Sequence, residues 1–202
     1  GIDYEYLMSW DHYGDEWSKI ADQRPFKQLP ILVVDNTHEI AQSIAILSYI
    51  EKLAGLDISD PIIAAKSDAV LQSAQELFAP FNPTVNFATG DDFSTKRDAM
   101  TPFLLSRFDD LSRALSISEG KFFIDDVPRA CDFAVFHHLD LSKNLDETLL
   151  HKFPRLEEFI DDIVAIESIR TYLDIRSELI EVGSMPKLVI DGVPHPTGIQ
   201  ET

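Results

Sequence analysis

The chain has 202 residues, enough for one large domain or two small ones with a buried core. Its 35 acidic residues outnumber its 17 basic ones and give a formal net charge of -18, so most of the surface would repel nucleic acid. A single cysteine, Cys131, excludes an internal disulfide and suits a reducing compartment, and no apolar run is long enough to span a bilayer. We therefore expect a cytoplasmic protein without a nucleic-acid or membrane partner.

The N-terminal part of the chain mixes short strands with short helices. Residues 2–7 alternate in polarity and are rich in Tyr and Ile, which predicts a strand. Residues 11–22 are mostly polar and predict a loop with a short, irregular helix. The β-branched run at 31–34, an Asp-Asn turn at 35–36 and residues 37–40 together predict a β-hairpin.

Helical patterns dominate after the hairpin. Apolar residues recur at helical spacing over residues 41–53 and stop at Gly55. A second helix is expected to start at Asp60-Pro61 and to be broken by Pro80 and Pro83. Apolar stripes predict further helices at residues 97–115, with Pro102 close to the start, and at residues 130–139, 154–166 and 168–173.

The end of the chain has a different pattern from the helices. Residues 187–190 and 193–195 flank an Asp-Gly turn and predict a small hairpin whose prolines limit its pairing. The pattern as a whole indicates a small α/β unit at residues 1–56, an all-helical domain at residues 57–177 and a tail at residues 178–202.

Three short stretches carry more specific information than this general layout. They are Pro25-Phe26-Lys27-Gln28-Leu29-Pro30 before the first hairpin strand, Gln42-Ser43-Ile44-Ala45-Ile46-Leu47-Ser48-Tyr49-Ile50 after the second, and a third stretch from Cys131-Asp132-Phe133 to Phe153-Pro154-Arg155-Leu156. At this spacing they resemble the cytosolic glutathione S-transferases of the sigma-like, tyrosine-using branch. The resemblance implies a thioredoxin-like α/β N-terminal domain, here without its first strand and helix, joined to an all-α C-terminal domain in a homodimer.

The first two stretches also make physical sense as a site for a small peptide. A proline that opens a strand is a common place for a cis bond, and a cis Leu29-Pro30 bond would leave the Leu29 backbone free to pair with an extended ligand. Ser43 stands where a helix begins, and unpaired N–H groups there attract a carboxylate. The resemblance implies that Leu29 and Pro30 hold the cysteinyl part of glutathione, and that Gln42 and Ser43 hold its γ-glutamyl carboxylate. The structural alternatives are a trans proline and an ordinary N-cap serine.

Three further ligand contacts are implied by the resemblance alone. Trp17 matches a tryptophan that contacts the glycine end of glutathione, and Gln28 matches a polar residue that touches the ligand. Glu76 matches an acid that reaches the α-amino group of the ligand in the partner subunit. Two positions depart from the pattern: Ala21 stands where a lysine often pairs with the glycine carboxylate, and Lys27 replaces a glycine.

No residue of this chain is predicted to activate the thiol. A thiol with a pKa of about 8.5 is mostly protonated at neutral pH, and the resemblance implies a tyrosine hydroxyl that stabilises the thiolate at the end of the first strand. Only 24 residues precede Pro25, too few for that strand, its helix and the next strand, so we expect the first strand and helix to be missing. Tyr4, Tyr6 and Tyr13 lie in segments that do not match the catalytic position.

The sequence therefore predicts, for the full-length form, a glutathione transferase that conjugates the glutathione thiolate to small hydrophobic electrophiles in detoxification. Glutathione is a substrate in this reaction, and neither a cofactor nor a metal is expected. The truncated chain itself is expected to be inactive. The alternative is a non-catalytic, glutathione-transferase-like structural or interaction protein, and the residues do not separate transferase from peroxidase or isomerase activity.

Overall fold

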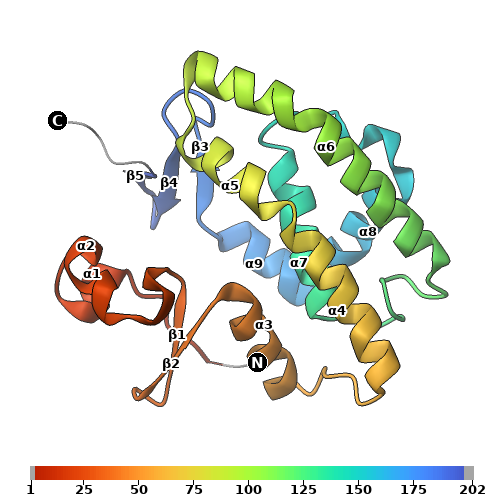
Figure 1. The fold of residues 1–202 in the computed structure, drawn as a ribbon, viewed down its shortest axis with the longest axis horizontal. Coiled ribbons are helices and arrows are strands. Elements are labelled where there is room, and N and C mark those ends of the chain that lie inside the picture. The colour runs from red at the N-terminus through yellow and green to blue at the C-terminus, as the bar shows by residue number, and fades with distance from the viewer. Residues whose placement is uncertain (1–2, 198–202) are drawn as a thin grey trace. The chain divides into compact units, whose positions relative to one another are not determined.

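The computed structural model describes residues 3–197, and the chain divides into two compact units, Gly1–Ser59 and Asp60–Thr202 (Figure 1). The strand expected at the start of the first unit is wrong for residues 3–7, which have no regular structure, while residue 2 lies outside the described residues. No described strand pairs with this segment, and Tyr4 and Tyr6 are exposed. Alternating polarity alone cannot hold a strand that has no neighbour.

The elements of the first unit follow one another closely. Its helical turns are α1 (Ser9–Tyr13), α2 (Trp17–Ile20), η1 (Ala21–Gln23) and η2 (Pro25–Lys27), and they are followed by β1 (Ile31–Val34), β2 (His38–Ala41) and the helix α3 (Ser43–Leu53). Among residues 3–59 only Ile20 is buried, at 8% exposure. Apolar burial therefore contributes little to the stability of this unit. Hydrogen bonds and ion pairs between its segments contribute a larger share of that stability than in a unit with a buried core.

The hairpin of the first unit is confirmed. β1 and β2 pair antiparallel with Ile31 opposite Ala41 and Val34 opposite His38. Three residues connect the strands; Asp35 and Asn36 both have positive φ, 51° and 56°, and the Thr37 N–H donates to the Val34 carbonyl at 3.1 Å, so Asp35 and Asn36 are the central residues of a tight turn. The helix after the hairpin packs on both strands, and its first residue therefore lies directly at the end of β2.

The second unit is mainly helical, and its core lies around one helix. Its helices are α4 (Pro61–Gln75), α5 (Phe78–Phe87), α6 (Gly90–Ile117), α7 (Ala130–Ser142), η3 (Leu149–Lys152), α8 (Pro154–Val164) and α9 (Glu167–Ile175). α7 packs against α4, α5 and α8, and most of its residues are buried. The predicted start of α4 is confirmed, because Asp60 Oδ1 accepts hydrogen bonds from the N–H groups of Ile62 and Ile63 at 2.8 and 3.0 Å.

Two predictions about prolines and helix bounds are wrong. Pro80 and Pro83 do not break the helix, because α4 already ends at Gln75 and both prolines lie within α5. Pro80 stands in the first turn of α5, where its missing N–H has no partner to lose. α6 begins at Gly90 rather than near residue 97, so Pro102 lies in its interior. Residues 90–96 are largely polar and show no apolar stripe, although acids in a first turn favour a helix start.

The tail forms a small antiparallel sheet attached to the second unit. β4 (Lys187–Ile190) and β5 (Val193–Pro196) form the predicted hairpin, and β3 (Glu178–Ile180), which was not predicted, pairs with β4. The Gly90 N–H donates to the carbonyl of Gly183 at 2.7 Å. A Cβ on Gly183 would lie 2.7 Å from Cδ1 of Phe93, and φ there is +79°, so this contact requires glycine.

Candidate functional site

The residues predicted to bind the peptide backbone and the γ-glutamyl end lie close together in the first unit. The Leu29-Pro30 bond is cis, as predicted, and β1 begins at the next residue. Gln42 ends the β2 side of the hairpin, and its side-chain amide donates to Oε1 of Gln28 at 3.3 Å. Ser43 is the first residue of α3. The hairpin therefore brings the segment before β1 beside the start of α3.

The start of α3 can receive an anion. Gln42, not Ser43, occupies the cap position, and its side chain makes no capping hydrogen bond. Its carbonyl accepts the N–H of Ile46 at 3.0 Å, which closes the first turn of the helix. Ser43 is the first helical residue and is exposed. Because Gln42 occupies the cap position, Ser43 is not the N-cap serine of the structural alternative. The first N–H groups of a helix have no partner within it, and a carboxylate can accept hydrogen bonds from them.

Trp17 lies in a cluster that no motif of the sequence predicts. Its ring is 6.3 Å from the ring of Tyr13, measured between centroids. The Arg24 guanidinium lies 4.6 Å above the Tyr13 ring and donates to Oε1 of Glu39 at 2.9 Å. The Tyr13 hydroxyl donates to the same oxygen at 3.3 Å. Arg24 and Glu39 are separated by 15 residues with no periodic relation, so no sequence signal pairs them.

Tyr13 is a poor thiol activator in this arrangement. Burial raises the pKa of its hydroxyl, and the Glu39 charge raises that pKa further, while Arg24 lowers it. A hydroxyl that donates to a carboxylate is not free to donate to a thiolate. The structure thus gives a physical reason for leaving Tyr13 without a catalytic role.

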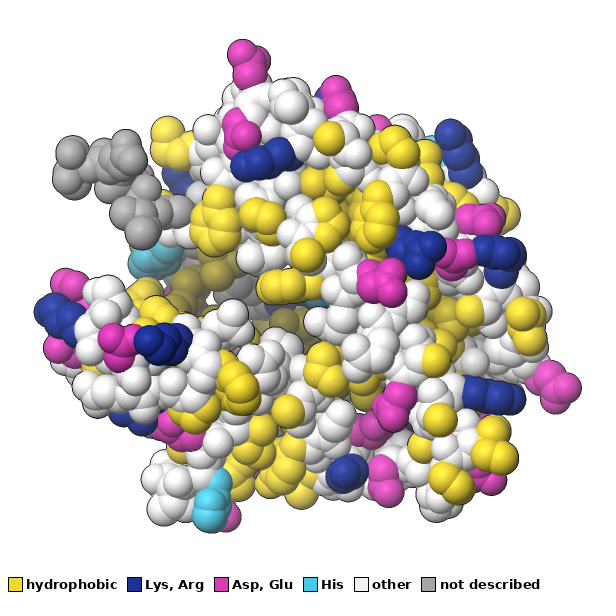
Figure 2. Space-filling model, in the orientation of Figure 1, with side chains coloured by type: hydrophobic (Ala, Val, Ile, Leu, Met, Phe, Trp, Pro, Cys, Tyr) yellow, Lys and Arg dark blue, Asp and Glu magenta, His cyan; other side chains and the backbone are white. Residues whose placement is uncertain are grey.

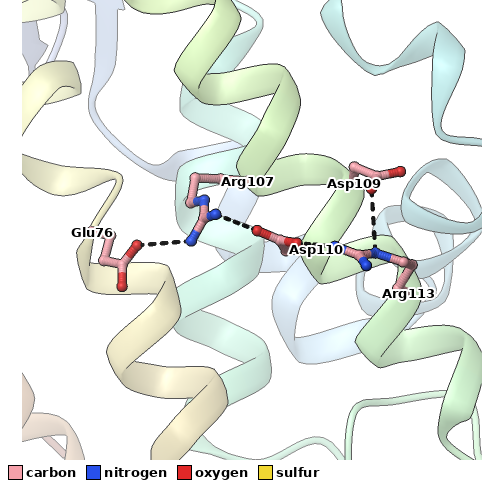
Figure 3. A network of polar contacts seen from close by, with 5 residues as sticks. All are labelled: Glu76, Arg107, Asp109, Asp110 and Arg113. Atoms are coloured by element: carbon pink, nitrogen blue, oxygen red, sulfur yellow. Dashed lines mark hydrogen bonds and ion pairs between the residues drawn. The ribbon is translucent and has the colours of Figure 1, made fainter.

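Glu76 belongs to the second unit, where it joins an ion-pair network at the end of α4 (Figure 3). Its carboxylate pairs with the Arg107 guanidinium of α6 at 3.1 Å. Arg107 also pairs with Asp110, which in turn pairs with Arg113. The Glu76 side chain remains 54% exposed to solvent while it pairs with Arg107.

The second unit also carries an apolar groove. Figure 2 shows apolar side chains gathered over α5 and α6. Between these helices lies a groove of about 410 Å³, lined by Pro80, Pro83, Thr84, Lys96, Ala99, Met100 and Phe103. Lys96 at its edge pairs with Asp92 at 2.8 Å. The groove therefore presents mainly apolar surface.

The described part of the chain contains neither a candidate metal site nor a helix that could span a membrane. Over residues 3–197, no three His, Cys, Asp or Glu side chains come together in a way that could hold a metal ion. None of the helices formed by these residues has both the length and the apolar character needed to cross a membrane.

Comparisons with known proteins find matches both for the helical part of the chain and for its fold. Residues 80–176 match the model of the glutathione S-transferase C-terminal domain. Among solved structures, NaGST-2 superposes with a TM-score of 0.72 at 21% identity, covering 80% of both chains. Monomeric Na-GST-3 from the hookworm Necator americanus gives a TM-score of 0.71 at 23% identity, covering 82% of both chains. The predicted fold class, a thioredoxin-like N-terminal region followed by a helical C-terminal domain, is confirmed.

Relatives of known sequence narrow the assignment further. Glutathione S-transferase P 10 of Caenorhabditis elegans is 27% identical over 179 residues, which are 87% of this chain and 81% of that protein. Hematopoietic prostaglandin D synthase of Gallus gallus is 30% identical over 185 residues, covering 87% of this chain and 85% of that protein. With this extent of similarity, the matched C-terminal domain and the shared fold, the chain belongs to the glutathione S-transferase family.

Proposed function

We propose that this protein binds glutathione and conjugates its thiolate to small hydrophobic electrophiles, as a member of the sigma-like branch. The observation that carries the proposal is the meeting of Gln28, Gln42 and Ser43 beside the cis Leu29-Pro30 bond. Family membership and the names of the relatives, which include several glutathione S-transferases, support the same reaction. No hydroxyl of residues 3–197 is proposed to activate the thiol, because Tyr4, Tyr6 and Tyr13 do not match the catalytic position and the Tyr13 hydroxyl donates to Glu39.

Each proposed contact has a defined chemical role. Extended backbone at Leu29 pairs with the cysteinyl unit and fixes the sulfur in place, so that attack on the electrophile becomes effectively unimolecular. The helix start at Ser43 and the amides of Gln28 and Gln42 hold the γ-glutamyl end, while Trp17 packs against the glycine end. In a homodimer, Glu76 would meet the α-amino group of the ligand bound by the partner subunit. Glutathione is a substrate, and no cofactor is proposed.

A non-catalytic role is the second candidate. S-crystallin 2 of Enteroctopus dofleini is 25% identical over 80% of this chain and 81% of that protein. In addition, Ala21 stands where family members often have a lysine, and Lys27 replaces a glycine of the family pattern. These observations favour a scaffold that keeps the peptide site without turnover.

Removing the Ser43 hydroxyl tests the binding site. In the 202-residue chain, Ser43→Ala should weaken glutathione binding about tenfold, because a hydrogen bond to a charged carboxylate is lost. Isothermal titration calorimetry measures the dissociation constant. Ser48→Ala, on the same helix five residues further, is the matched control and should bind like the parent chain.

Turnover separates the two candidates. Conjugation of glutathione to an activated aryl chloride is followed by absorbance, on the 202-residue chain and on the protein purified from its natural source. Binding with turnover in the natural protein supports the transferase, and binding without turnover supports the non-catalytic scaffold. Absence of glutathione binding in both samples contradicts both candidates.

A further inference from the structure

A continuous set of contacts connects Trp17 to the hairpin. The Trp17 ring lies beside the Tyr13 ring, the Arg24 guanidinium covers the same tyrosine ring, and Arg24 and Tyr13 both donate to Glu39 on β2. Glu39 is the second residue of β2, and Gln42 directly follows the last residue of that strand. The two ends of the proposed glutathione site are therefore linked through Arg24 and Glu39.

These contacts connect segments of the first unit that bury few side chains against one another. Residues 9–27 form short helical turns, and Ile20 is the only buried residue in the described part of the first unit. The Arg24 and Glu39 side chains are each only 25% exposed, so their ion pair is better shielded from solvent than a typical surface pair. A partly buried, charge-assisted hydrogen bond is worth more than a surface contact.

The other cations of this segment do not make such a connection. Lys19 pairs with Asp15 and Glu16, which directly precede α2, and Lys27 pairs with Asp22 nearby. All these partners lie within five residues of the lysine that they contact. Arg24 is different because its partner lies on β2, across the unit. Since its charge is balanced by Glu39, Arg24 is also poorly suited to pair directly with a ligand carboxylate.

We propose that Arg24 and Glu39 are positioning residues, which hold the Tyr13 and Trp17 rings against the hairpin and so place Trp17 at the glycine end of bound glutathione. This inference rests on the proposed function. It predicts that the pair affects recognition of the glycine end and leaves the γ-glutamyl end unchanged.

A ligand without the glycine residue makes this inference testable. In the 202-residue chain, Arg24→Met should weaken glutathione binding roughly fivefold, an effect expected for a lost ion pair of about 1 kcal/mol. Binding of γ-glutamylcysteine, which lacks glycine, should change less than about twofold. Arg24→Lys keeps a cation beside Glu39 and should recover most of the affinity. Lys19→Met, which also removes one positive charge from this segment, should bind both ligands like the parent chain.

Two outcomes of the titrations would overturn the proposal. Equal losses for glutathione and γ-glutamylcysteine would mean that Arg24 acts on the whole site, and no loss for either would mean that the pair positions nothing. Glu39→Gln keeps the size of the side chain and serves as the second variant if Arg24→Met does not fold. It should show the same selective loss as Arg24→Met.

Trp17 fluorescence tests the positioning without any ligand. In a Trp10→Phe background, which leaves Trp17 as the emitting tryptophan, Arg24→Met should shift the emission maximum to longer wavelength and lower its anisotropy. Unchanged emission would overturn the positioning role. If neither the parent chain nor the protein purified from its natural source binds glutathione, the proposed function is wrong, and the emission still decides whether Arg24 and Glu39 hold Trp17 in place.

Discussion

Replacing Asp132 by Ala should destabilise the helical unit by about 3 kcal/mol, because two backbone N–H groups lose their acceptor. Asp132 is fully buried at the start of α7. One of its carboxylate oxygens accepts the N–H of Phe123 at 2.9 Å, and the other accepts the N–H of Arg129 at 2.8 Å. The ring of Phe123 packs edge-on against Phe159 of α8 at 5.4 Å, so the same carboxylate anchors the loop before α7 to the core.

Urea unfolding followed by helical circular dichroism measures this loss. Asp132→Asn keeps one carbonyl acceptor and should lose roughly half as much stability as Asp132→Ala. Asp161→Ala, an exposed acid on α8, removes the same charge and should change the free energy of unfolding by less than about 0.5 kcal/mol. Similar effects of Asp132→Ala and Asp161→Ala would show that charge, and not the buried hydrogen bonds, decides the result.

Protonation of His138 should make the helical unit about 3 kcal/mol less stable at acid pH. Burial lowers the pKa of His138 to about 4, with a smaller contribution from neighbouring His137. The side chain is 2% exposed, and its ring stacks on Phe81 of α5 at 6.2 Å. Between about pH 6.5 and about pH 4, His138 is protonated in the unfolded chain but neutral in the folded chain. The free energy of unfolding therefore decreases as pH falls through this range and levels off below about pH 4. Each pKa unit is worth about 1.4 kcal/mol, which gives the expected total.

His138→Phe should remove this part of the pH dependence. The free energy of unfolding is measured at about pH 7 and about pH 4.5 for the parent chain and the variant, and the difference between the two pH values should shrink by about 2 kcal/mol or more in the variant. His151→Gln, an exposed histidine in η3, should retain the full dependence. An unchanged pH dependence in His138→Phe would mean that other groups cause the acid destabilisation, such as the carboxylates or His137, whose pKa burial also lowers.

Local signals explain which elements the sequence predicts well. The Asp35-Asn36 turn, the start of α3 at Ser43 and the cap at Asp60 each depend on residues next to one another, and all three are found where expected. Long-range packing explains what it misses. β3 forms because residues 178–180 lie beside β4. The strand expected at residues 2–7 does not form over residues 3–7, because no described strand lies beside them.

In the candidate site, too, the residues in recognisable motifs could be predicted from the sequence and the long-range pair could not. The stretches that resemble the family predict that Gln28 and Gln42 serve one ligand, and the two side chains are joined by a hydrogen bond. Arg24 and Glu39 could not be paired from sequence, because opposite charges 15 residues apart occur often in an ordinary chain. Their pairing depends on how the turns of residues 9–27 fold back on β2, and no local motif encodes that path.

The small sheet at the C-terminal end has a mechanical consequence for the helices. The family model ends at residue 176, yet the next segment contacts the junction of α5 and α6 through Gly183, and Thr197 donates to the carbonyl of Asn86. Through these hydrogen bonds the sheet connects the end of α5 to the start of α6, and we expect it to oppose separation of the two helices. A peptide inserted at the exposed Asp191-Gly192 turn would leave these contacts in place. A side chain introduced at Gly183 would collide with the Phe93 ring and push the sheet away from α6.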